Sequence, residues 1–188
     1  MPIHRATSKT TLLAIAMALL VSGALRAQSH GDQFVGTIVN MEGGGTAPVV
    51  IHIDHYSSDQ EIANLKGILA SKGPDGLRDA LWDLEAGYIR VKGGLGYPVA
   101  AARSKPDAGG GRVIRLMIDR PLSFREEANS LRSADYPFSY VELHLDAGGK
   151  GDGKFIAAAK VTLDANNTVD IESLGVQPFK LLDVHSSR

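Results

Sequence analysis

The sequence predicts an α+β fold, a mostly antiparallel β sandwich or barrel with an inserted helical hairpin. Three observations support this prediction: short runs with alternating apolar residues, turn residues between those runs, and one stretch with helical periodicity. Short strands at regular spacing, separated by Gly, Pro, Asn and Asp, are typical of antiparallel sandwiches and barrels. The chain contains no cysteine, so neither a disulfide nor a thiolate zinc site holds the fold together.

Residues 1–27 have the pattern of a secretory signal peptide. A basic opening precedes the apolar run LLAIAMALLVSGAL, and the small residues around Arg26 end at Ala27. The run is shorter than the ~20 residues of a membrane-spanning helix, so we expect cleavage after Ala27, with a retained anchor as the alternative. Residues 28–188 then form a single β-rich domain, periplasmic or secreted, without a membrane span.

The net charge bears on the class of partner. The whole chain has 20 Lys and Arg against 21 Asp and Glu, and the first 27 residues hold three of the basic residues and no acid. The exported part is therefore mildly acidic and has no basic stripe, so no nucleic acid is expected as a partner.

The exported part opens with a predicted hairpin and then a pair of helices. Strands are expected at 34–41 and 48–56, on either side of a Gly-rich turn. Ser58 and Glu61 have the spacing of a capping box, and Gly73 ends the first helix before Pro74. Leu77, Leu81 and Leu84 predict the buried edge of a second helix that ends at Gly87 and carries Trp82 near that edge.

The rest of the chain is expected to form strands separated by turns. The predicted strands are 88–92, 99–104, 112–119, 138–146, 154–163, 168–172 and 178–184. The clearest is 138–146, where Val141, Leu143 and Leu145 share one face and Tyr140, Glu142, His144 and Asp146 share the other.

A long polar segment leads into that strand, and it is the predicted ligand-binding region. Pro121 and Pro137 interrupt any strand between them, and long crossing loops are often functional. The candidate binding residues are Arg120, Arg132, Asp135, Tyr136 and Tyr140. In the alternative, structural interpretation, Arg120 and Arg132 hold Asp119 and Asp135 as internal ion pairs.

A metal site is the second candidate. His52 and Asp54 share one strand face, and Glu142 and His144 share another. Histidine with carboxylates suits zinc, iron or manganese, and the four would converge if the two strands were neighbours. The alternative is that each pair lies on a solvated strand face.

The segments RPLSF, LRSADYPFSYVELHLD and GKGDGKFIAAAKV resemble a family of uncharacterised exported bacterial proteins, over about 33–184. The resemblance implies one folded unit and brings no activity, substrate or cofactor. We expect a non-catalytic binding or envelope-associated module whose partner is a small ligand or an envelope protein. The alternative function is a metal-dependent enzyme built on the two His and carboxylate pairs, and the residues identify no cofactor.

Overall fold

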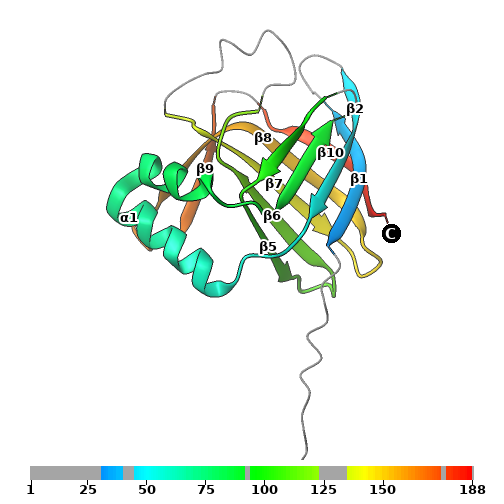
Figure 1. Ribbon diagram of the computed structural model, residues 1–188. Helices are drawn as coiled ribbons and strands as arrows, with labels where there is room; N and C mark the ends of the chain where they lie inside the picture. Colours follow the sequence, from blue (N-terminus) through cyan, green and yellow to red (C-terminus); the bar gives the residue numbers. More distant parts are fainter. Residues whose placement is uncertain (1–30, 40–44, 92–93, 123–134, 175–176, 188) are drawn as a thin grey trace, which may run out of the picture.

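The computed structural model describes residues 31–39, 45–91, 94–122, 135–174 and 177–187. Its elements follow in the order β1 Asp32–Val39, β2 Thr46–Ile53, α1 Asp59–Trp82, β3 Gly87–Val91, β4 Gly96–Val99, β5 Ala101–Pro106, β6 Arg112–Ile118, β7 Phe138–Leu145, β8 Lys150–Leu163, β9 Val169–Ser173 and β10 Phe179–Ser186. The predicted α+β class is confirmed, because antiparallel strands make up most of the fold and α1 packs beside them (Figure 1).

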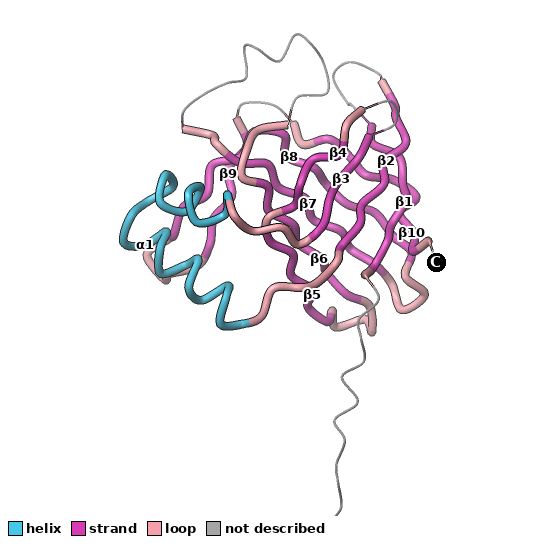
Figure 2. The backbone as a smooth tube through the Cα atoms, viewed as in Figure 1, coloured by secondary structure: helices cyan, strands magenta, loops and turns pink. Residues whose placement is uncertain are grey.

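The strands form a nearly closed barrel. Their order is β4-β3-β2-β1-β10-β8-β7-β6-β5, and β9 pairs with β8 outside this order. Each of these neighbouring pairs is antiparallel. The two ends of the order, β4 and β5, are separated in the chain by Ala100 alone. The Ala100 N–H donates to the carbonyl of Met117 on β6 at 2.9 Å, so one bent strand joins the sheet's two ends (Figure 2).

This bend corrects the strand predicted at 99–104. The segment contains the last residue of β4, the bend and the first part of β5. Ala101 packs in the cluster beneath α1, whereas Ala102 packs inside the barrel. Ala101 and Ala102 are both buried, but on different sides of the sheet. The run of apolar residues therefore reads as one straight strand and does not reveal that the pairing partner changes from β3 to β6.

Apolar side chains fill the barrel interior. On β6, Ile114, Leu116 and Ile118 are each 0% exposed and point inward, while Arg115 and Met117 alternate outward. Phe34 and Phe155, both 0% exposed, contribute the largest rings to this core. A barrel of about eight strands has an interior just wide enough for side chains to fill, which is what this core does.

Helix α1 begins as predicted. The Glu61 N–H donates to Ser58 Oγ at 3.2 Å and the Ser58 N–H donates to Glu61 Oε2 at 2.7 Å, which completes the capping box. Gly73 has φ 69° and ψ −167°, so the two expected helices are two halves of α1 bent at this residue, before Pro74. Leu69, Leu77 and Leu81 are buried against the barrel.

The end of α1 differs from the prediction. The helix stops at Trp82 with Asp83 as its cap, and Gly87 is instead the first residue of β3. Leu84 lies beyond the helix and is 38% exposed, so its place on the buried edge was wrong. The helical spacing of Leu77, Leu81 and Leu84 continues past the residue where the backbone leaves the helix.

A second apolar cluster lies between α1 and the outer face of the barrel. It joins the three buried leucines of α1 to Phe138 and Tyr140 of β7 and to Ile156, Ala159 and Val161 of β8. In the part of the chain that the structure describes, no helix is both long and apolar enough to cross a membrane.

Candidate functional site

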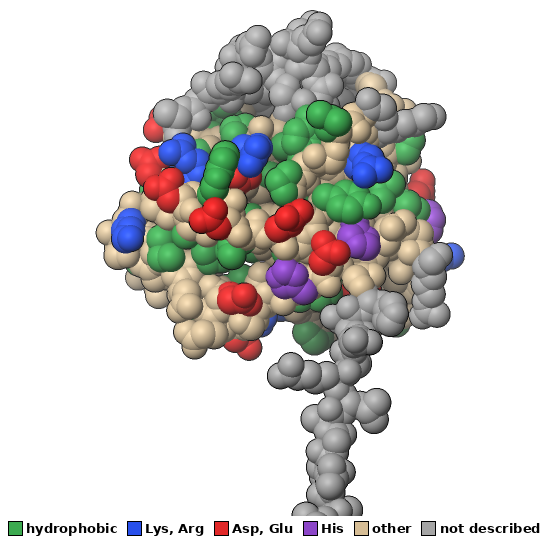
Figure 3. Space-filling model, viewed as in Figure 1, with side chains coloured by type: hydrophobic (Ala, Val, Ile, Leu, Met, Phe, Trp, Pro, Cys, Tyr) green, Lys and Arg blue, Asp and Glu red, His purple; other side chains and the backbone are tan. Residues whose placement is uncertain are grey.

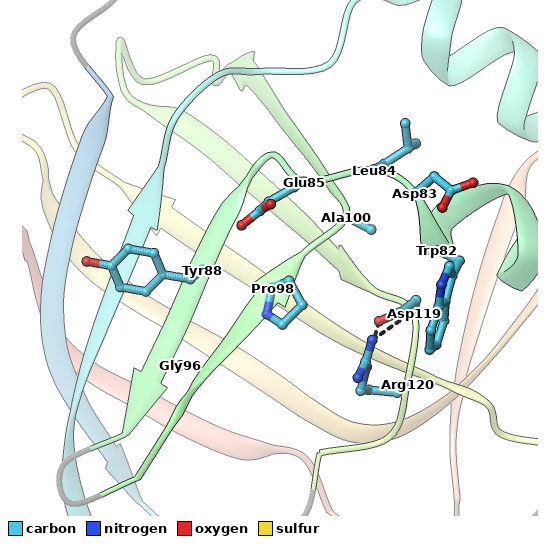
Figure 4. A pocket seen from close by; sticks show the side chains of 10 residues that line it. All are labelled: Trp82, Asp83, Leu84, Glu85, Tyr88, Gly96, Pro98, Ala100, Asp119 and Arg120. Atoms are coloured by element: carbon cyan, nitrogen blue, oxygen red, sulfur yellow. Dashed lines mark hydrogen bonds and ion pairs between the residues drawn. The ribbon is translucent and has the colours of Figure 1, made fainter.

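A hollow outside the barrel lies between the end of α1, the outer face of β3 and β4, and the residues after β6. We call it the Trp82–Arg120 hollow (Figure 4). Its volume is about 350 Å³, and its walls are Trp82, Asp83, Leu84, Glu85, Tyr88, Gly96, Pro98, Ala100, Asp119 and Arg120. Tyr88 and Pro98 pair across β3 and β4 and point outward, because the alternate residues Ile89 and Val99 fill the barrel.

An ion pair forms one wall of the hollow. Arg120 Nε and Nη2 donate to Asp119 Oδ1 and Oδ2 at 2.9 and 2.8 Å, a bidentate arrangement. The Asp119 side chain is 4% exposed and that of Arg120 is 42% exposed. The hydrogen bonds to Asp119 raise the pKa of Arg120 above its ordinary value. The pair therefore holds a permanently charged guanidinium in a fixed orientation, with its Nη1 group not used by Asp119.

Trp82 lies beside this guanidinium. The Arg120 Cζ atom is 5.1 Å from the centre of the indole ring, a cation–π contact, and Trp82 is 65% exposed. Its exposure follows from its position, since its neighbour Leu81 occupies the buried stripe of α1 and is 1% exposed. The next residue along a helix lies about 100° around the axis, which carries Trp82 out of the stripe.

The segment that carries Arg120 is fixed by a buried serine. Ser139 on β7 is 0% exposed, and its Oγ accepts from the Leu122 N–H at 2.8 Å. The same hydroxyl lies 2.9 Å from the Arg120 carbonyl oxygen and 2.8 Å from that of Ala157. Because the backbone of Arg120 and Leu122 is hydrogen-bonded to β7 and β8, the segment that carries the guanidinium is held against the barrel.

Tyr88 forms the opposite wall. Its ring stacks on His52 with a centroid separation of 5.2 Å, and the Arg90 Cζ atom lies 5.1 Å from its centre. His52 and Tyr88 are directly opposite each other on β2 and β3. The stack fixes the phenol at one side of the hollow, and Figure 4 shows Pro98 between Tyr88 and Arg120.

Of the five predicted ligand-binding residues, the structure places one in this hollow. Arg120 lines it, and the predicted pairing of Arg120 with Asp119 is confirmed. Arg132 lies outside the described residues. Asp135 is exposed and is not among the residues that line the hollow.

The two predicted tyrosines make other contacts. The Tyr136 hydroxyl donates to Glu172 Oε1 at 2.7 Å, and this hydrogen bond raises the pKa of Tyr136. Tyr140 is 4% exposed in the cluster beneath α1, and its hydroxyl donates to Glu142 Oε2 at 2.7 Å. Tyr140 is therefore part of the packing of α1 and is not among the residues that line the hollow.

The two predicted metal-ligand pairs form, but they do not converge. His52 Nε2 lies 3.1 Å from Asp54 Oδ1 near the end of β2, and His144 Nε2 lies 3.0 Å from Glu142 Oε1 on β7. In the sheet order β1, β10 and β8 separate β2 from β7, and the other route passes β3, the bent strand β4–β5 and β6.

Both pairs point away from the barrel, so they lie on opposite outer faces. The condition for a four-ligand site, neighbouring strands with facing polar surfaces, is therefore not met. Among the described residues, no group of three or more His, Asp or Glu side chains is placed to hold a metal ion.

Glu142 is held by its own neighbours. Besides Tyr140 and His144, its carboxylate accepts from Arg115 Nε at 2.8 Å and lies 3.2 Å from Lys154 Nζ. Burial acts to raise the pKa of Glu142, but these hydrogen bonds and the charge of Lys154 lower it to about 2. Arg115 and Lys154 are opposite Glu142 on β6 and β8, so the carboxylate links three strands. Its role here is cross-strand stabilisation.

The prediction from sequence missed most of the hollow. Trp82 was expected near a buried edge, and Asp83, Glu85, Tyr88 and Pro98 were not singled out. One signal was available: the chain's single tryptophan stands one position beyond the apolar stripe, between Leu81 and two acidic residues. The convergence of α1, β3, β4 and the end of β6 depends on the closure of the barrel, which local pattern does not reveal.

Comparison with protein-family models, with curated proteins and with solved structures finds no match to this chain. The resemblance to exported bacterial proteins remains an expectation, and function is inferred from the geometry of the Trp82–Arg120 hollow.

Proposed function

We propose that this protein is an exported, non-catalytic binding module that holds a small ligand in the Trp82–Arg120 hollow. Export is supported by the signal-peptide pattern of residues 1–27. Binding is supported by a concave surface that combines aromatic rings with a few oriented polar groups, the usual composition of a small-molecule site.

The observation that carries the proposal is the buried Asp119 beneath Arg120. A carboxylate that is 4% exposed is costly unless it is paired, and here both of its oxygens are used to orient one guanidinium. The Nη1 group forms no hydrogen bond with the described residues, so it can donate to an acceptor group of a ligand without any loss of the internal pair. A donor that is already oriented loses little conformational entropy when a ligand binds.

The position of the hollow on the outer face of the barrel agrees with a barrel interior that is filled by side chains. The barrel core contains Phe34, Phe155 and Leu181, each 0% exposed. The inward side chains of the described strands therefore pack against one another. The ten lining residues of the hollow include no serine, threonine, histidine or lysine. The described lining therefore supplies the aromatic rings and charged groups of a binding surface.

A blocking variant tests the proposal. An added Cβ at Gly96, which lines the hollow, would come no closer than 3.7 Å to a neighbour, and its φ lies outside the positive range. Gly96→Leu should therefore fold and place its side chain in the hollow. We expect that a panel of sugars, amino acids, amines and organic acids, measured by thermal shift and tryptophan emission, contains a ligand that the parent binds and Gly96→Leu does not.

Gly109→Leu is the matched control. Gly109 is exposed, its φ is not positive, and no atom lies within 4 Å of an added Cβ. Ligands should bind this variant as they bind the parent. If every ligand found binds Gly96→Leu as well as it binds the parent, the hollow is not the binding site and the proposal fails.

The export part has its own measurement. Intact-mass analysis of the secreted protein should show Gln28 as the first residue, after cleavage following Ala27. Recovery of the uncleaved chain in the membrane fraction would refute cleavage and support the anchored alternative.

A further inference from the structure

We propose that the ligand of the Trp82–Arg120 hollow carries a protonated amine, so that the hollow is a site for a small organic cation. This inference rests on the proposed function and adds the charge class of the ligand to it.

The charge balance of the hollow supports a cation. Asp119 and Arg120 neutralise each other in their bidentate pair. The remaining ionisable carboxylates of the lining, Asp83 and Glu85, are exposed and form no hydrogen bond or ion pair with the described residues. Arg90, which lies on the Tyr88 ring, adds one positive charge beside the lining. The two carboxylates outweigh it, so the described part of the hollow keeps a small excess of negative charge, which repels a carboxylate or phosphate ligand and attracts an ammonium group.

The aromatic walls suit the same class of ligand. Two cations of the chain already lie on these rings at cation–π distance, Arg120 on Trp82 and Arg90 on Tyr88, each with its Cζ atom 5.1 Å from the ring centre. Trp82 is still 65% exposed, so indole surface is left for a further contact. A cation held between carboxylates and aromatic rings gains from both kinds of attraction.

The orientation of the carboxylates fits a molecule with two charged ends. In Figure 4, Glu85 directs its carboxylate toward the space between Tyr88 and Pro98, and Asp83 lies beside Trp82 at the other end of the hollow. Figure 3 shows acidic side chains interspersed with Lys and Arg on this face, so the attraction of a cation depends on the carboxylates of the hollow itself. A protonated amine can pair with either carboxylate, and an acceptor group elsewhere on the ligand can take the Nη1 hydrogen bond of Arg120.

Three probes of equal chain length separate charge from shape: 1,4-diaminobutane, 1,4-butanediol and succinate. Each is titrated into the full exported chain while the emission of its single tryptophan, Trp82, is recorded. We expect saturable binding of the diamine, weakened by added salt, and at least about tenfold weaker binding of the diol and the diacid.

Substitutions in the lining test whether the diamine binds in the hollow. Glu85→Gln and Asp83→Asn should each weaken diamine binding about twofold to fivefold, the range for an exposed ion pair, and the double variant should weaken it further. Both carboxylates are exposed and have no hydrogen bond or ion pair with the described residues, and the backbone N–H of Asp83 that caps α1 is kept in Asn, so the midpoint of urea unfolding should stay unchanged. Asp170→Asn, an exposed carboxylate on β9, is the control and should bind as the parent does.

The outcomes distinguish this inference from the function on which it rests. If the diol or succinate binds at least as tightly as the diamine and Gly96→Leu abolishes that binding, the hollow is a ligand site and the cation class is wrong. If the diamine binds Gly96→Leu or the double acidic variant as it binds the parent, it is held by diffuse surface charge and the inference is overturned. If none of the probes binds at 10 mM, a scale of about 3 kcal/mol of binding free energy, the inference is also overturned, while the wider ligand panel still tests the proposed function.

Discussion

Replacement of Arg120 by Met removes the guanidinium and keeps most of the apolar stem, so it isolates the charge of the pair. The Asp119 carboxylate, 4% exposed, then loses both of its hydrogen bonds to Arg120. Breaking a fully buried pair from one side costs about 3–5 kcal/mol. Because Arg120 is 42% exposed, water can reach part of the site, and we expect about 2–4 kcal/mol of unfolding free energy to be lost.

The second variant in this cycle is Asp119→Asn. In the parent it removes a favourable partner of Arg120 and should destabilise the fold by about 1–2 kcal/mol. In the Arg120→Met background the same change removes an uncompensated buried charge, so it should stabilise the fold. This reversal of sign separates a desolvated ion pair from simple loss of packing.

The measurement is urea unfolding at neutral pH followed by far-ultraviolet circular dichroism. Tryptophan emission is unsuitable here because Arg120 contacts Trp82, the chain's single tryptophan, and its loss changes the signal in the folded state. If Arg120→Met is as stable as the parent, or if Asp119→Asn destabilises both backgrounds equally, Asp119 does not depend on Arg120 and the rigid donor wall has no support.

Three further predictions concern the barrel and α1. The pKa of Glu142 is lowered to about 2, so the stability that its charge contributes is present above pH ~4.5 and is lost as the pH falls toward 2. In urea unfolding, Glu142→Gln should lower the free energy of unfolding by about 2 kcal/mol at pH 7 and by little at pH 2. Equal losses at the two pH values would contradict this. Gly73 has φ 69°, a conformation that alanine adopts with strain, so Gly73→Ala should lower the free energy of unfolding by about 1–3 kcal/mol. Gly67 lies in the helix with open space around an added Cβ, so Gly67→Ala should raise it by about 0.5–1 kcal/mol. If both changes stabilise the protein, the bend at Gly73 is unstrained. Leu81 is 1% exposed, so Leu81→Ala should lower the free energy of unfolding by about 2–5 kcal/mol. Lys72 is exposed, so Lys72→Ala should lower it by less than about 0.5 kcal/mol. Matching urea midpoints for the two variants would refute the buried stripe of α1.

The strands could be predicted wherever one face is buried and the other is solvated. On β7 the inward residues Val141, Leu143 and Leu145 and the outward Glu142 and His144 are placed as the alternation predicts. Alternation does not reveal a strand's neighbours, however. The pairs on β2 and β7 were both correctly placed on polar faces, yet their faces lie on opposite sides of the barrel, and the predicted metal site required them to meet.

The hollow was harder to predict because its parts are unremarkable separately. Trp82 belongs to the end of α1, Tyr88 to β3 and Arg120 to the segment after β6. They meet only because the bent strand at Ala100 brings β3 and β6 to the same region of the barrel wall. A helix end one residue from its apolar stripe predicts an exposed tryptophan, but no local pattern predicts which strands surround it.

The proposed binding hollow is separate from the packed barrel interior, so the two can be changed by different substitutions. The inward side chains of the barrel stabilise its core, whereas the carboxylates of Asp83 and Glu85 are exposed and form no hydrogen bond or ion pair with the described residues. Substitution of either acid should alter the charge of the hollow with little effect on stability. Arg120 differs, because the same guanidinium neutralises buried Asp119 and faces the hollow. The charge of the proposed site can therefore be changed at the two acids, while Arg120 is constrained by its part in folding.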